Sequence, residues 1–180
     1  IAAFVSHCTT IIGIGFITRI ANLKLAITQR VRGQLQHVKD ICRQELQLAR
    51  ESGMAQTVVS GWLRTIYGEV LAELNELEEA RSCVEKGIAI VEQGSELSIR
   101  ASSYIFSLRV YFSTGEYDKA EEIIQELERA ICSYDVPPWI DHHKEAWKAR
   151  IWLARGEMGP VTRWCEERGL VVSGDLVYSR

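Results

Sequence analysis

The chain has 180 residues, 47% of them hydrophobic and 25% charged, so it is long enough for one folded domain and too apolar for a disordered one. Its formal net charge is -3 at pH 7, and this weakly acidic balance argues against direct binding of nucleic acid. The sequence begins at Ile1 rather than Met, and we expect it to be part of a longer protein.

The opening stretch, residues 1–15, is apolar but does not resemble a membrane segment. No basic residues precede it, His7 and Cys8 interrupt the apolar run, and it is too short for a convincing span. We interpret it as a preceding helix at a severed domain edge and predict a cytoplasmic protein without membrane contact. The five cysteines never show C-x-x-C spacing, so we expect small buried residues rather than disulfides or metal ligands.

A turn sequence recurs about every forty residues beyond this stretch. Its turn residues are Gly33, Asn75, Gly115 and Gly156, at spacings of 42, 40 and 41. Each is followed by a polar residue, an apolar residue, two further residues and then Ala or Val, with the last copy carrying Gly159 and Pro160 before its Val. A fixed period of this size is typical of stacked helical hairpins, because one hairpin cannot bury its apolar face alone.

The period predicts four hairpins, at about 16–53, 56–94, 97–135 and 139–169. Within them we expect helices at about 15–31, 34–51, 56–74, 78–93, 97–113, 117–134, 139–154 and 160–168. Pro137 and Pro138 separate the third hairpin from the fourth, since residues before proline avoid helical angles. Residues 170–180 are predicted to form a loosely ordered tail. The predicted fold is all-α, a right-handed superhelix of antiparallel helical hairpins, that is, a tetratricopeptide-like α-solenoid.

Small residues are expected where the second helix of each hairpin crosses the first. Val38, Ala80, Ala120 and Val161 occupy this position in the four copies. A short side chain there allows two helix axes to approach to about 8–10 Å. Gly68 stands at the matching place on the facing helix.

The sequence contains no pattern that supports catalysis. It lacks a phosphate-binding G-x-x-x-x-G-K-[ST] loop, a G-x-S-x-G turn and an H-E-x-x-H helix. His142 and His143 are adjacent, so on a helix they point about 100° apart and make a poor metal pair. We therefore predict no enzyme activity, no catalytic residues and no metal site.

A concave groove is the expected binding surface, lined by the first helix of each hairpin. Glu69, Arg109 and Arg150 occupy equivalent places in successive repeats. Arginine and aromatic side chains together suit a polar small molecule or a peptide. The alternative is that the two arginines and Glu69 only pair across neighbouring helices. The predicted groove residues are Trp62, Thr65, Glu69, Ser102, Ile105, Arg109, Phe112, His143, Ala146 and Arg150.

Several segments resemble the helical repeats of the large MalT-type activators of the LuxR family. They are residues 32–49 and 67–80, and, with the most specific likeness, VPPW at 136–139, ARIWLARGE at 149–157 and RWCEERGL at 163–170. The likeness extends from about residue 16 onward. Val38 and Val161 depart from the small residue expected at the crossing, and no family motif identifies ligand residues in this chain.

The resemblance implies a place within a three-part protein. Members of this family combine an N-terminal ATPase module, a middle superhelix and a C-terminal DNA-binding helix-turn-helix. This chain is then the middle part, which senses an effector and takes part in self-association. ATP would belong to the N-terminal module, so no cofactor is expected here. The implied partners are a small-molecule inducer or a regulatory protein.

Two other readings remain open at this point. The chain could be a generic tetratricopeptide-type scaffold that binds peptides and has no link to transcription. It could also be a pure self-association module that uses the apolar residues Ile11, Ile12, Ile14 and Phe16.

Overall fold

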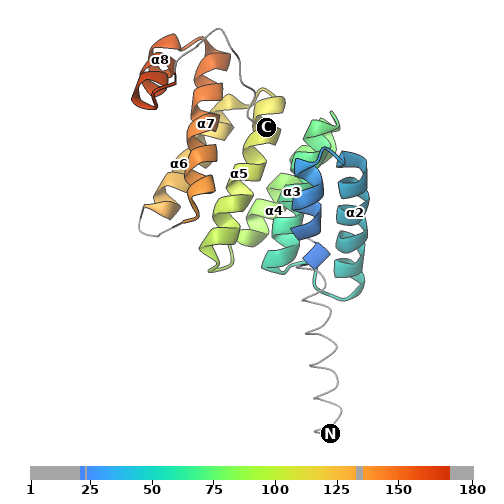
Figure 1. The fold of residues 1–180 in the computed structure, drawn as a ribbon. Coiled ribbons are helices and arrows are strands. Elements are labelled where there is room, and N and C mark those ends of the chain that lie inside the picture. Colours follow the sequence, from blue (N-terminus) through green and yellow to red (C-terminus); the bar gives the residue numbers. More distant parts are fainter. Residues whose placement is uncertain (1–20, 23, 133–135, 171–180) are drawn as a thin grey trace, which may run out of the picture.

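The computed structural model describes residues 21–22, 24–132 and 136–170. The predictions for residues 1–15 and for most of the tail lie outside these residues. All regular elements in the described part are helices, as predicted, and they follow one another as a helical solenoid (Figure 1). After a helical stretch at 24–31 come α2 (Leu35–Glu51), α3 (Val58–Glu73), α4 (Leu77–Val91), α5 (Leu97–Ser113), α6 (Tyr117–Ile131), α7 (Pro138–Arg155) and α8 (Met158–Glu167).

The four predicted turn residues all adopt the left-handed conformation. Their φ angles are +76° at Gly33, +61° at Asn75, +75° at Gly115 and +75° at Gly156. The residue after each turn then donates its N–H to a carbonyl five residues earlier, as from Glu116 to Tyr111 at 2.8 Å. This bond closes the end of the preceding helix and reverses the chain. The repeat identified from the sequence is therefore a repeat of one helix-ending turn.

Some helix ends differ from the predicted ones by a few residues. Helix α6 ends at Ile131 rather than near residue 134. Helix α8 begins at Met158, so Pro160 is its third residue and not its first. The first turn of a helix does not use its N–H groups within the helix, so proline is tolerated at either place. Pro138 is the first residue of α7, with Pro137 as its N-cap.

The small residues at the helix crossings are buried as predicted. Val38, Ala80 and Ala120 have no exposed surface, and Val161 is 9% exposed. A Cβ atom built at Gly68 would lie 2.9 Å from the carbonyl oxygen of Ala80, so α3 and α4 touch at this point. The prediction of a close crossing between these helices is confirmed.

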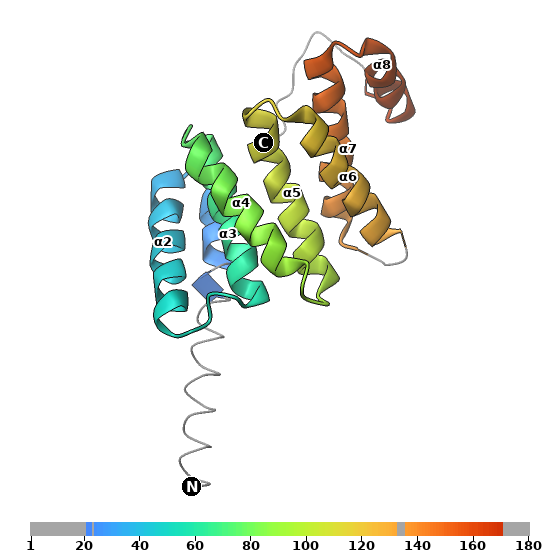
Figure 2. The same ribbon diagram turned by 180° about the vertical axis from the view of Figure 1, so that it is seen from behind.

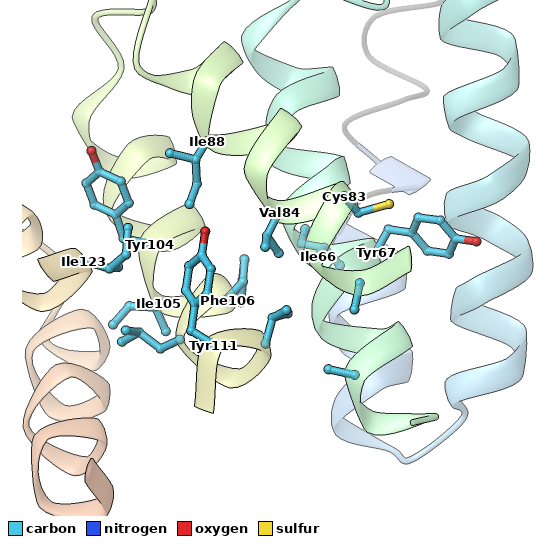
Figure 3. Close-up of a cluster of buried hydrophobic side chains, with 14 of the residues drawn as sticks. Ile66, Tyr67, Cys83, Val84, Ile88, Tyr104, Ile105, Phe106, Tyr111 and Ile123 are labelled. Atoms are coloured by element: carbon cyan, nitrogen blue, oxygen red, sulfur yellow. The ribbon is translucent and has the colours of Figure 1, made fainter. Parts of the chain in front are cut away.

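One apolar core runs along the array. Figure 3 shows part of it, with Ile66 and Tyr67 from α3 beside Val84 from α4, and Phe106 from α5 farther along. The first helices of successive hairpins also pack directly on one another, α3 against α5 and α5 against α7. The views from both sides agree that these helices stand in a row (Figures 1 and 2). This row forms the wall that positions the candidate site.

The prediction for the cysteines is correct only in part. Cys42 and Cys83 are buried, whereas Cys165 is partly exposed and Cys132 is exposed. Cys132 follows the last residue of α6 as its C-cap. Cys8 lies outside the described residues. None of the helices within the described ranges is long and apolar enough to cross a membrane.

Candidate functional site

A cavity of about 880 Å³ lies along the row of first helices. Four helices contribute to its walls: the stretch at 24–31, α3, α5 and α7. We call this cavity the groove. Eight of the ten residues predicted for the concave face line it, namely Trp62, Glu69, Ser102, Ile105, Arg109, His143, Ala146 and Arg150. Whether they bind a ligand stays a prediction.

Two of the predicted residues do not line the groove. Thr65 is fully buried and donates its hydroxyl to the carbonyl oxygen of Trp62 at 2.8 Å. Its methyl group lies 2.7 Å from where a Cβ of Gly87 would stand, so it fills the close contact between α3 and α4. Phe112 packs its ring against Tyr117 and Trp147, with centroids 5.4 and 5.5 Å away.

The structure also adds groove residues that the prediction missed. The largest omission is the helical stretch at 24–31, which contributes Lys24, Ile27 and Arg30. A signal for this stretch existed, because Ile27 stands six residues before Gly33. Glu69, Arg109 and Arg150 stand six residues before their own turn residues, and all line the groove. The same six-residue offset, applied to Gly33, therefore predicts that this first stretch also faces the groove. The other additions are Thr28, Val31, Ser98, Ile99, Phe106, Pro137, Trp139, Ile140, His142 and Trp147.

Glu69 is a buried carboxyl group at the centre of an ion-pair network. It is 5% exposed, and its Oε1 lies 2.5 Å from Nη1 of Arg30. Arg109 places its Nε 4.0 Å from the same oxygen and 3.0 Å from Oε1 of Glu73. Burial raises the pKa of Glu69 to about 7, although the guanidinium groups of Arg30 and Arg109 oppose this rise. Arg109 and Glu69 thus approach each other across α5 and α3, and whether they also bind a ligand stays a prediction.

Arg150 behaves differently from Arg109. Within the described ranges it forms no ion pair with a carboxylate, and its guanidinium carbon lies 4.6 Å from the ring centroid of Trp147. The guanidinium of Arg109 lies 5.4 Å from that same ring. Loss of hydration and the charge of Arg109 lower the pKa of Arg150. The pairing alternative is wrong for Arg150.

Aromatic rings lie beneath the other groove cations as well. Lys24 places its Nζ 5.2 Å from the ring centroid of Trp62, and Arg30 places its guanidinium carbon 5.3 Å from that of Phe106. A cation over an aromatic face is attracted by about 0.5–1 kcal/mol at exposed sites and by more when water is excluded. These contacts hold the cations along the groove walls.

The two histidines belong to the start of α7 rather than to a metal centre. Nδ1 of His143 lies 2.8 Å from the carbonyl oxygen of Trp139, one helical turn earlier. In the described part of the chain, no group of three or more His, Cys, Asp or Glu residues is arranged to hold a metal ion. What the groove offers is cationic donors and flat aromatic faces, which suit binding.

The family described as MalT-like TPR region, where TPR denotes the tetratricopeptide repeat, matches residues 9–177. A similar curated protein is the HTH-type transcriptional regulator MalT of Vibrio campbellii (strain ATCC BAA-1116), which is 28% identical over 135 residues. That alignment covers 74% of this chain but only 15% of the relative, so the chain spans a small part of that protein's length. No solved structure matches the chain significantly.

Proposed function

Because this chain belongs to the MalT-like TPR family, we propose that it is the effector-sensing segment of a transcription regulator and carries out no catalysis itself. Its ligand is a small-molecule inducer or a regulatory protein, bound in the groove. The transcription link is supported by the relative, whose name describes a transcriptional regulator. The same relative makes a peptide-binding scaffold unrelated to transcription the weaker alternative.

The observation that carries the proposal is the composition of the groove. Small-molecule sites have volumes of about 300–1,000 Å³ and combine apolar walls with a few convergent polar groups. The groove, at about 880 Å³, presents Trp62, Trp139 and Trp147 together with Arg109 and Arg150. A ligand of drug-like size therefore fits the space and finds both kinds of contact.

The placement of the groove explains how binding would be sensed. Its walls come from all four hairpins, since the stretch at 24–31, α3, α5 and α7 are the first helices of successive repeats. A ligand that touches several of them favours one spacing of the repeats over others. The ligand binds that spacing more tightly than the others, and this difference in binding free energy is available to change the conformation of a longer regulator.

Self-association is part of the same proposal but has less support. The apolar residues 11, 12, 14 and 16, which we expect to contribute, lie outside the described residues. Among the described residues, Leu153 and Met158 are more than half exposed near the last hairpin turn. These two side chains are candidates for a contact surface.

The experiment is a thermal-shift screen of the chain against metabolites, followed by calorimetric titration of each hit. A groove ligand should lose at least tenfold in affinity in Arg150→Ala, because the change removes a guanidinium group that has no carboxylate partner among the described residues. Arg163→Ala is the control, since Arg163 is exposed on α8 away from the groove. Equal affinities in all three proteins would contradict the assignment of the groove.

The transcription part needs a separate measurement. Transcripts are compared with and without the confirmed ligand, in cells that carry the gene and in cells from which it is deleted. The proposal expects a set of ligand-dependent transcripts that disappears on deletion. A ligand that binds the groove but changes no transcripts would favour the scaffold alternative.

A further inference from the structure

The groove carries an excess of positive charge although the whole chain is acidic. Among the described residues its walls contain Lys24, Arg30, Arg109 and Arg150, but only one carboxylate, Glu69. The net charge of the chain is -3, so the groove is a local exception. Glu69 is already engaged by Arg30 at 2.5 Å.

Arg109 and Arg150 are neighbouring cations of the groove that approach the same aromatic ring. Both guanidinium groups approach the ring of Trp147, at 5.4 and 4.6 Å from its centroid. The Nε of Arg109 lies 3.0 Å from Oε1 of Glu73 but forms no hydrogen bond among the described residues, and the guanidinium carries four further N–H donors. Arg150 has no carboxylate partner in the described parts of the chain. With Glu69 held by Arg30, these two cations have one remaining close carboxylate, Glu73, so an added anion is stabilised beside them.

A flat aromatic face lies along the same wall. Trp139 is 40% exposed and lines the groove from the first turn of α7. Its ring stacks on Phe106 with an interplanar angle of 22° and a centroid distance of 6.5 Å. The stacking holds the indole in place while part of it stays uncovered. Such a face favours a planar ring in a ligand, since offset aromatic pairs attract each other beyond the effect of area burial.

We infer that the groove selects an anionic aromatic ligand, with the anion held by Arg109 and Arg150 and the ring resting on Trp139. This inference deepens the proposed function by naming the chemical class of the effector. Carboxylates and phosphates share the chemistry that the two guanidinium groups recognise. A neutral ligand would leave Arg150 without a counter-charge, and a long polyanion is disfavoured by the acidic remainder of the chain.

Two fluorescent probes test the anion directly. 1-Anilinonaphthalene-8-sulfonate and N-phenyl-1-naphthylamine have the same ring system and differ in the sulfonate. Titrated into the chain, the sulfonate probe should bind at least tenfold more tightly, because hydrogen bonds between charged groups are stronger than those between neutral groups. The preference should shrink as salt is raised, since partly exposed charges are screened.

Matched variants locate the effect in the groove. Arg150→Gln should remove most of the preference for the sulfonate probe and leave the neutral probe unchanged. Arg163→Gln, on the exposed side of α8, should retain the wild-type preference. Trp139→Ala should lower the affinity for both probes equally. Circular-dichroism melting confirms that each variant is folded, and Arg150 and Trp139 are exposed enough for this to hold.

Competition distinguishes the two sources of negative charge. Phenyl phosphate and benzoate are expected to displace the sulfonate probe, whereas phenol and benzamide are not. The stronger competitor identifies a phosphate or a carboxylate as the preferred group.

Equal affinity for the two probes, or an unchanged preference in Arg150→Gln, would overturn the inference. If the affinity for both probes is nevertheless lower in Trp139→Ala, the groove binds ligands. The proposed function then stands, but its ligand is not required to be an anion. If no groove variant affects either probe, the groove assignment fails with the inference.

Discussion

Glu69 of α3 and Arg30 of the preceding hairpin form an ion pair of 2.5 Å at the wall of the groove. The pair links the first helices of two successive repeats. Glu69 is nearly inaccessible to water, and its second carboxylate oxygen has no hydrogen-bond partner among the described atoms. A carboxyl group in this setting connects the stability of the array to pH.

Glu69→Gln should change how stability depends on pH. The folded-state pKa of Glu69, about 7, lies above its ordinary value of 4.5, so folding favours the protonated form. The contribution of this group to stability is then fullest below pH 4.5 and is lost as pH rises to about 7. Relative to Glu69→Gln, the wild type should lose on the order of 3 kcal/mol of unfolding free energy over this range. Urea unfolding at several pH values measures it, and parallel curves for the two proteins would refute the assignment.

Gly68→Ala should destabilise the array by about 2 kcal/mol or more, because overpacking displaces neighbouring atoms. The added Cβ would lie 2.6 Å from Cγ1 of Val84 and 2.9 Å from the carbonyl oxygen of Ala80. Gly159→Ala is the matched control, since nothing lies within 4 Å of its added Cβ. It should be neutral or stabilising by at most about 1 kcal/mol. Thermal melting that ranks the two variants in the opposite order would show that α3 and α4 do not touch there.

Ala120→Glu should cost several kcal/mol, because it places an unpaired charge where no side-chain surface is exposed. The same change at Ala154, which is exposed on α7, should stay within about 0.5 kcal/mol of wild type. Denaturant unfolding of both variants measures the contrast. Intact cooperative unfolding of Ala120→Glu with wild-type stability would mean that the crossing register is wrong.

Asn75 is the one turn residue of the four that is not glycine, and it has a φ of +61°. Asn75→Gly should therefore be neutral or slightly stabilising, because glycine adopts this conformation without strain. Asn75→Val should cost about 1–2 kcal/mol, since a β-branched residue is disfavoured there. Melting temperatures that do not separate the two variants would contradict the turn geometry.

The predicted self-association should appear as an increase of the sedimentation coefficient with protein concentration. If the surface includes the last hairpin turn, Leu153→Glu and Met158→Glu should reduce this dependence, because both side chains are more than half exposed. Leu48→Glu on α2, also exposed but at the other end of the array, is the control. A monomer at all concentrations would exclude the interaction for this chain.

The sequence by itself determined the repeat and therefore the architecture. Gly33, Asn75, Gly115 and Gly156 mark turns that require a left-handed residue, and this requirement is local to each turn. Ala80 and Ala120 mark crossings, because only a small side chain is compatible with two helices in contact. The same period placed eight of ten residues along the groove wall, since equivalent positions of stacked repeats face the same side.

Only the tertiary structure decided which of those side chains have partners and which do not. Thr65 turned toward α4 because Gly87 on the neighbouring helix leaves room for its methyl group. Arg109 is engaged by Glu73, whereas Arg150 rests on Trp147 without a carboxylate. These outcomes depend on distances between helices that are far apart in the chain, and a periodic pattern carries no information about such distances. The unbalanced charge in the groove is consequently a property of the folded array.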